Sequence, residues 1–152
     1  MSLMKLNQLY RSVILDHANH PRNFGELATR TSDLVLRNPS CGDIINVQIQ
    51  VEANQIRAIK FRGSGCTISN ASASIMTTMV KGKSLAAARR IINLFLDNIV
   101  NKEIKEDEQD QLGDALLLSN VAKFPTRIRC ATLSWHALAD LIDEQEGVKI
   151  ND

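Results

Sequence analysis

The three cysteine side chains are the residues of this chain best suited to chemistry. Cys41 lies in the turn-forming run Asn-Pro-Ser-Cys-Gly-Asp, which places the carboxylate of Asp43 two residues beyond the thiol. Cys66 follows Gly-Ser-Gly at the start of an expected helix, and Cys130 lies just before the last amphipathic segment. Three thiolates and one carboxylate form a four-ligand set for a soft or borderline metal, and Zn²⁺ accepts this mixture in a tetrahedral site.

Other uses of these residues were weighed against metal binding. The odd number of cysteines argues against a closed disulfide framework, and no Cys-x-x-Cys pair indicates a zinc ribbon or a thioredoxin-type dithiol. A single free cysteine is most often a small buried hydrophobic residue, but these three lie in glycine-flanked or turn contexts. His17 and His20 are expected at a helix end, and His136 in a packing or surface role. No protease-like signature supports a Cys–His hydrolase.

The central part of the chain predicts a small antiparallel sheet. Ile45, Val47, Ile49 and Val51 alternate with polar residues, which indicates a strand with one buried face. The run 53–55 is expected to turn the chain into a returning strand over 56–62, with a bulge near Ala58-Ile59. A short strand over 34–36 completes a three-stranded meander.

Helices are expected both before and after these strands in the sequence. The first ends before Pro21, and the second covers 66–80 with Gly82 just beyond its end. Ser84 is expected to cap a third helix that runs toward residue 100. The charged run 101–110 is expected to be a solvated loop or helix start, and a short helix is expected near 112–118. The last helix is expected to start near Cys130 and to bury one stripe: Leu133, Ala137, Leu138, Leu141 and Ile142.

These elements suggest how the thiols meet. Cys41 lies where the central strand begins and Cys66 where its hairpin partner ends, so antiparallel pairing returns both to one end of the sheet. Cys130, expected at a helix N-terminus, would approach from the side. Helix N-termini at Cys66 and Cys130 favour thiolate over thiol, and Arg129 adds a positive charge.

The bulk properties predict one soluble domain over residues 1–152. The 152 residues are 44% hydrophobic and 23% charged, with a net charge of +1, which gives no support to nucleic-acid or membrane binding. No run approaches the roughly 18 apolar residues of a membrane span, and the N-terminus lacks a secretory signal. Reduced thiols without an export signal indicate a cytoplasmic protein.

Four stretches carry a resemblance to a known family: Tyr10–Gly25, Asn38–Asp43, Gly63–Cys66 with the helix after it, and Val80–Lys83. Together they resemble the NifU-like/IscU scaffold superfamily. Arg129 stands where the cluster-scaffold branch has a histidine, and 121–127 replaces that branch's Leu-Pro-Pro-Val-Lys motif. An extra segment within roughly 84–118 also lengthens the gap before Cys130. These departures are similar to SufU, the zinc-containing branch.

The resemblance implies an α+β fold of the IscU/SufE-like type, a small three-stranded antiparallel sheet covered by about five helices. It implies zinc held by Cys41, Asp43, Cys66 and Cys130. It also implies a zinc-dependent sulfurtransferase in which Cys41 accepts persulfide sulfur from a pyridoxal-phosphate cysteine desulfurase of the SufS type. The sulfur would pass to downstream iron–sulfur assembly scaffold proteins, and the chain is expected to be a monomer.

Two alternatives stay open at this stage. One is a scaffold on which a [2Fe–2S] cluster is assembled and passed on, since such clusters also take thiolate ligands. The other is a structural zinc domain that only mediates protein contacts, although such sites are usually closed by Cys and His alone.

Overall fold

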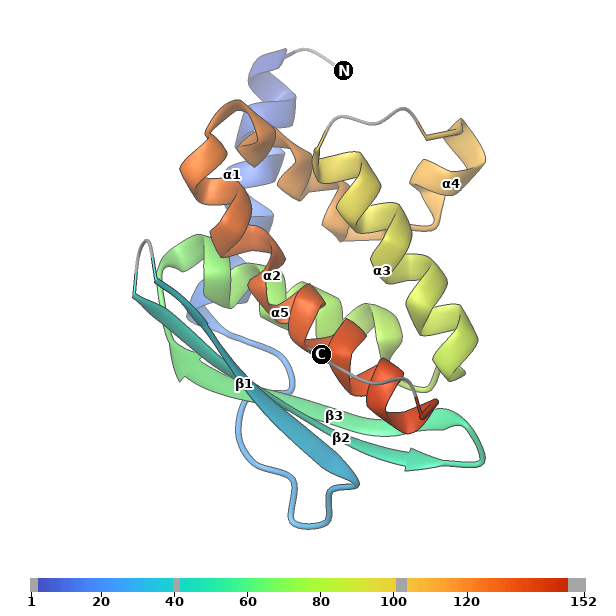
Figure 1. Ribbon diagram of the computed structural model, residues 1–152. Helices are drawn as coiled ribbons and strands as arrows, with labels where there is room; N and C mark the ends of the chain where they lie inside the picture. Colours follow the sequence, from blue (N-terminus) through green and yellow to red (C-terminus); the bar gives the residue numbers. More distant parts are fainter. Residues whose placement is uncertain (1–2, 40–41, 101–103, 148–152) are drawn as a thin grey trace.

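A computed structural model describes residues 3–39, 42–100 and 104–147 of the chain. Figure 1 shows a three-stranded sheet below a group of helices. The elements in chain order are α1 (Leu3–Asn19), β1 (Ser32–Asn38), β2 (Asp43–Glu52), β3 (Gln55–Ser64), α2 (Thr67–Val80), α3 (Leu85–Ile99), α4 (Glu106–Asp110), the 3-10 helix η1 (Gly113–Lys123) and α5 (Pro125–Gln145). The predicted α+β class is confirmed.

The sheet is the predicted antiparallel meander, with β2 between β1 and β3. Ile45, Val47 and Ile49 are at most 1% exposed, which confirms the buried face read from their alternation. The β2–β3 register shifts at Gln50/Val51 and skips Arg57, so the bulge precedes the predicted position at 58–59 by one residue. The alternation of apolar side chains is lost only beyond the extra residue, which made the bulge look later than it is.

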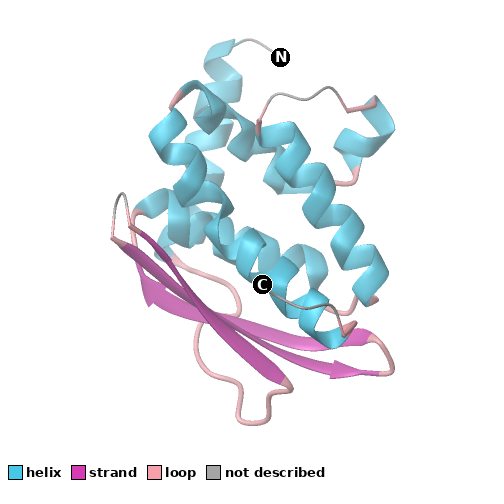
Figure 2. Ribbon diagram, in the orientation of Figure 1, coloured by secondary structure: helices cyan, strands magenta, loops and turns pink. Residues whose placement is uncertain are grey.

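The helices lie on one face of the sheet, as Figure 2 shows, and the core fills the space between the two layers. The ring of Trp135 on α5 stacks on Phe95 of α3, with ring centroids 4.0 Å apart. The Nε1–H of Trp135 donates to Ser72 Oγ on α2 at 2.8 Å, and that hydroxyl donates to the carbonyl of Ala131. This buried polar chain fixes α5 against α2, and α5 carries one of the three cysteines.

Most helix ends lie where the sequence predicts them. α1 ends before Pro21, Cys66 is the N-cap of α2, and Gly82 just beyond α2 has a φ of +81°. The Ser84 side chain accepts from the N–H of Ala87 at 3.0 Å and caps α3 as predicted. The stripe predicted for the last helix is buried.

The start of the last helix was predicted wrongly. α5 begins at Pro125 rather than near Cys130, so Cys130 lies in its second turn. Proline suits the first helical position, because its fixed φ matches the helix and its missing N–H would have no partner there. In the part of the chain that the structure describes, no helix has the length and apolar character needed to span a membrane.

Candidate metal centre

Asp43 is placed by the tight turn that leads from β1 into β2. The N–H of Gly42 donates to the carbonyl of Asn38 at 2.8 Å, and Gly42 has a φ of +77°, a conformation that favours glycine. Asp43 follows as the first residue of β2 and is only 2% exposed. Cys41, predicted as a ligand and as the sulfur acceptor, precedes Gly42 in the sequence and lies outside the described residues.

Cys66 reaches Asp43 from the other strand of the β2–β3 hairpin, at the end of the sheet where β2 begins and β3 ends. Ile44 pairs with Ser64 at that end of the sheet, and the chain then turns into α2 with Cys66 as its N-cap. The backbone N–H of Cys66 donates to Asp43 Oδ1 at 3.0 Å, and its Sγ lies 3.9 Å from Asp43 Oδ2. The N–H of Ser69 points at the same sulfur, with 3.5 Å between N and Sγ. One thiol and one carboxylate thus share a corner lined by backbone donors.

Cys130 joins this corner from α5. Its side chain is 4% exposed, and its thiol lies 3.8 Å from the carbonyl oxygen of Thr126, one turn earlier in α5. One ligand atom each from Asp43, Cys66 and Cys130 lie within 4.8 Å of one another. Cys130 thus approaches Cys66 from the side, as expected, whereas the predicted meeting of Cys41 with Cys66 involves a residue outside the described ranges. The helix N-terminus predicted for Cys130 is not found, because Cys130 lies in the second turn of α5 and a dipole effect is confined to the first turn.

Gly65 keeps the space beside the Asp43 carboxylate open. A Cβ built on Gly65 would lie 2.9 Å from Asp43 Oδ1, 3.1 Å from its Cγ and 3.1 Å from Ser69 Oγ. Contacts of 2.9 Å are shorter than carbon and oxygen tolerate without moving apart. Only glycine at this position lets Asp43 occupy its present place.

The described donor set fits a zinc ion. Zinc takes cysteine sulfur at about 2.3 Å and carboxylate oxygen at about 2.0–2.2 Å, so a tetrahedral ion would hold sulfur and oxygen about 3.5 Å apart. The 3.9 Å between Cys66 Sγ and Asp43 Oδ2 is close to that separation. The other separations among the three ligand atoms are at most 4.8 Å.

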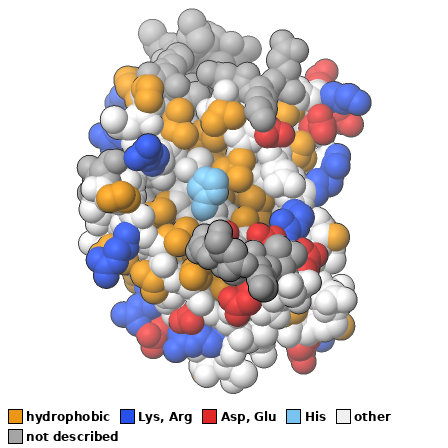
Figure 3. Space-filling model, viewed as in Figure 1, with side chains coloured by type: hydrophobic (Ala, Val, Ile, Leu, Met, Phe, Trp, Pro, Cys, Tyr) orange, Lys and Arg blue, Asp and Glu red, His pale blue; other side chains and the backbone are white. Residues whose placement is uncertain are grey.

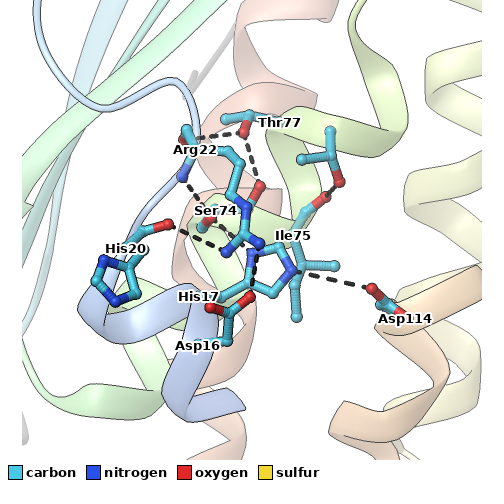
Figure 4. Close-up of polar contacts among 9 residues, drawn as sticks. Asp16, His17, His20, Arg22, Ser74, Ile75, Thr77 and Asp114 are labelled. Carbon is cyan, nitrogen blue, oxygen red and sulfur yellow. Dashed lines mark hydrogen bonds and ion pairs between the residues drawn. The ribbon is translucent and has the colours of Figure 1, made fainter. Parts of the chain in front are cut away.

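The three histidines do not take part in this cluster. His17 lies in the last turn of α1, where its Nδ1 is 2.7 Å from Ser74 Oγ and its Nε2 is 3.9 Å from Asp114 Oδ2 (Figure 4). Burial, and then the nearby Arg22, hold the pKa of His17 below its ordinary value, with Asp114 acting in the opposite direction. His17 thus lies at a helix end, as expected, and is also a buried link between α1 and α2.

Arg22, in the loop after α1, contacts the residues around His17. Its guanidinium donates to Asp16 Oδ2 at 2.6 Å and to the carbonyl of His20 at 3.1 Å, and its backbone N–H donates to Ser74 Oγ (Figure 4). The hydrogen bond from Arg22 is the main reason that the pKa of Asp16 is lowered. The contacts hold the 16–22 stretch, part of the family resemblance, against α2.

The comparisons with known proteins place the chain in a family. The sequence profile of the NifU-like N terminal domain matches residues 9–131. A Bacillus subtilis protein named zinc-dependent sulfurtransferase SufU is 44% identical over 143 residues, covering 93% of this chain and 95% of that protein. A Streptococcus pyogenes protein named iron-sulfur cluster assembly scaffold protein IscU is 43% identical over 142 residues, covering 93% and 87%.

Solved structures agree with this assignment. The crystal structure of a hypothetical protein superposes with a TM-score of 0.84 at 42% identity, covering 90% of this chain and 98% of that one. A proposed iron–sulfur cluster assembly scaffold protein of the SUF system from Fervidobacterium islandicum gives a TM-score of 0.81 at 25% identity, covering 88% and 96%.

The chain belongs to the NifU-like N-terminal domain family, whose relatives above are named for iron–sulfur cluster assembly and for sulfur transfer. Within that family it is a SufU-like member.

Sequence reasoning missed one residue of the centre. Ser69 presents its N–H to Cys66 Sγ and its hydroxyl to the space beside Gly65. The spacing of an N-cap residue and the third residue after it is a recognisable signal. It was overlooked because cysteine is not among the usual capping residues.

Proposed function

We propose that this protein is a zinc-dependent sulfurtransferase, which accepts persulfide sulfur on Cys41 from a cysteine desulfurase and relays it for iron–sulfur cluster assembly. The observation that carries the proposal is the mixed donor set of Asp43, Cys66 and Cys130, within 4.8 Å of one another at one end of the sheet. A structural zinc site is usually closed by Cys and His alone, so a donor set that includes Asp43 is less typical of a purely structural role. The 44% identity to a protein named zinc-dependent sulfurtransferase adds support.

The proposed ligand set is Asp43, Cys66, Cys130 and Cys41. Bound zinc would keep the cysteine sulfurs deprotonated and protect them from oxidation. The N–H of Cys66 donates to Asp43 and the N–H of Ser69 points at Cys66 Sγ, so backbone donors orient both of these ligands. Arg129, next to Cys130, contributes positive charge beside the thiolates.

The transfer step is thiol exchange. The thiolate of Cys41 attacks the outer sulfur of the desulfurase persulfide, the sulfur–sulfur bond breaks, and the desulfurase cysteine leaves as a thiolate. Cys41 then carries the added sulfur as a persulfide. The electrons balance without an added oxidant, and the pyridoxal phosphate that formed the first persulfide belongs to the partner.

A scaffold for a [2Fe–2S] cluster is the second candidate, because a relative at 43% identity is named a scaffold protein. The two functions share thiolate ligands but differ in the metal that they hold. Zinc, iron and acid-labile sulfide measured on anaerobically purified protein separate them. About one zinc per chain without sulfide supports sulfur transfer, and iron with matching sulfide supports the scaffold.

The function itself is tested with a cognate cysteine desulfurase. Wild-type protein should raise the rate of sulfide release and should gain one sulfur atom on Cys41, detected by mass spectrometry after thiol alkylation. Cys41→Ser should abolish both effects, because serine cannot form a persulfide. A Thr78→Ala control, at an exposed position on α2, should behave as wild type. Full acceleration by Cys41→Ser would show that the acceptor is another residue.

A further inference from the structure

A small pocket lies beside the candidate metal centre, between the end of β1 and the outer face of α5. Its volume is about 190 Å³. Three lining residues come from the end of β1 and the turn after it, Arg37, Asn38 and Pro39. Four come from α5, Arg129, Thr132, Leu133 and His136, and their spacing of three, four and seven residues from Arg129 places them on one face of that helix.

The pocket is positively charged and offers neutral hydrogen-bonding groups. Arg37 and Arg129 bring guanidinium groups from β1 and α5, and His136 adds an imidazole. Among the described residues that line it, none is acidic. Figure 3 views the α5 side of the molecule, where an exposed imidazole lies among hydrophobic and uncharged atoms, with basic and acidic side chains further out. Such a lining selects an anion.

The pocket adjoins the thiol cluster through two direct links. Asn38 pairs with Asp43 across β1 and β2, so a wall of the pocket is the neighbour of a proposed ligand. Arg129 precedes Cys130, whose sulfur belongs to the cluster. Cys41, the proposed sulfur acceptor, follows the lining residue Pro39 by two positions in the sequence, and two residues span at most about 7 Å of chain.

The volume of the pocket and the chemistry of its lining residues limit the class of ligand further. Pockets for drug-sized ligands are usually about 300–1,000 Å³, so this one suits a molecule of amino-acid size. Guanidinium groups bind carboxylates through paired, charge-assisted hydrogen bonds. Pro39 and Leu133 supply apolar surface for a short aliphatic chain. A small carboxylic acid matches all of these features.

We propose that this pocket binds the carboxylate of a small thiol that removes the sulfur from Cys41. This inference rests on the proposed function and names the class of acceptor that follows it. The acceptor thiolate attacks the outer sulfur of the Cys41 persulfide. The sulfur–sulfur bond breaks, Cys41 leaves as a thiolate, and the acceptor carries the transferred sulfur with its proton as a new persulfide.

The test compares two thiols of similar size, 3-mercaptopropionate with a carboxylate and 2-mercaptoethanol without one. Cys41 is loaded with persulfide by exchange of sulfide into a Cys41 mixed disulfide, which needs no desulfurase. The rate constant for sulfur removal is measured with each thiol. The ratio of the rate constant with 3-mercaptopropionate to that with 2-mercaptoethanol cancels any effect on Cys41 that is the same for both thiols. Arg37→Gln should lower the ratio about tenfold, the effect of losing one charged hydrogen bond.

Arg57→Gln is the matched control. It removes the same charge from an exposed arginine at the far end of β3, where Arg57 pairs with Glu52. Its ratio should equal that of the wild type. Equal ratios in Arg37→Gln, Arg57→Gln and wild type would overturn the proposal. So would an Arg37→Gln variant that slows loading by the desulfurase and leaves the ratio unchanged, because the pocket would then serve protein docking.

Binding is also measured without any transfer chemistry. Propionate, which has no thiol, should shift the imidazole NMR signals of His136 in wild type and in Arg57→Gln, and not in Arg37→Gln. An unperturbed His136 at saturating propionate would overturn the proposal. Failure of the desulfurase to load Cys41 would refute the proposed function instead, and the chemically loaded protein would still report on the pocket.

Discussion

Replacing Gly65 by alanine should weaken zinc binding while leaving the fold intact. The added Cβ would lie 2.9 Å from Asp43 Oδ1 and 3.1 Å from Asp43 Cγ. Ordinary carbon–oxygen contact begins at about 3.3 Å, so the carboxylate must move by about 0.4 Å. Metal ligands tolerate about 0.2 Å of displacement, which makes this movement large enough to cost affinity.

The expected loss of zinc affinity follows from the role of Gly65. It supports Asp43 without being a ligand itself, and losing such support usually reduces metal affinity by 10–100-fold. That range corresponds to about 1.4–2.7 kcal/mol of binding free energy. The hydrogen bond from the Cys66 N–H to Asp43 Oδ1, now 3.0 Å long, would weaken with the same movement.

The assay is a competition titration of zinc against a chromogenic chelator, with thermal unfolding of the zinc-free protein alongside. Gly82→Ala is the matched control. A Cβ there would meet nothing within 4 Å, so the only cost is that of alanine at the φ of +81° that Gly82 adopts. It should lower stability by about 1–2 kcal/mol, the cost of a left-handed alanine, and leave zinc affinity unchanged. Wild-type zinc affinity in Gly65→Ala would refute Asp43 as a ligand.

Three further outcomes are expected. Burial holds the pKa of His17 below its ordinary value, so the unfolded chain binds the proton more readily. The free energy of unfolding should therefore fall as the pH drops below about 6.5, and His17→Gln should flatten that dependence in denaturant titrations. Ser72→Ala should cost about 1–3 kcal/mol, because it leaves the buried N–H of Trp135 without its acceptor. An unchanged denaturation midpoint would count against that role. Zinc at a hundredfold excess over its dissociation constant should stabilise the protein by about 2.7 kcal/mol in calorimetry, and a chelator should reverse this without unfolding the chain.

Local patterns sufficed for most of the helices and strands and for choosing candidate ligands. The alternation from Ile45 to Val51 reports which strand face is buried, because successive side chains of a strand point to opposite faces. Ser84 and Gly82 mark helix ends through hydrogen bonding and backbone conformation that depend on a few neighbouring residues. Asp43 and Cys66 could be selected in the same way, since a carboxylate or thiol beside glycine in a turn is visible in the sequence, whereas Cys130 was selected by its residue type and lies inside α5.

Only the tertiary structure decided how these residues meet. Cys130 comes from the second turn of a helix that Pro125 starts early, and its position depends on contacts between α5 and α2, such as Trp135 with Ser72. The requirement for glycine at position 65 arises from a carboxylate 22 positions earlier, which pairing of β2 with β3 brings alongside. A sequence pattern reports local conformation, whereas distances between remote side chains follow from how whole elements pack against one another.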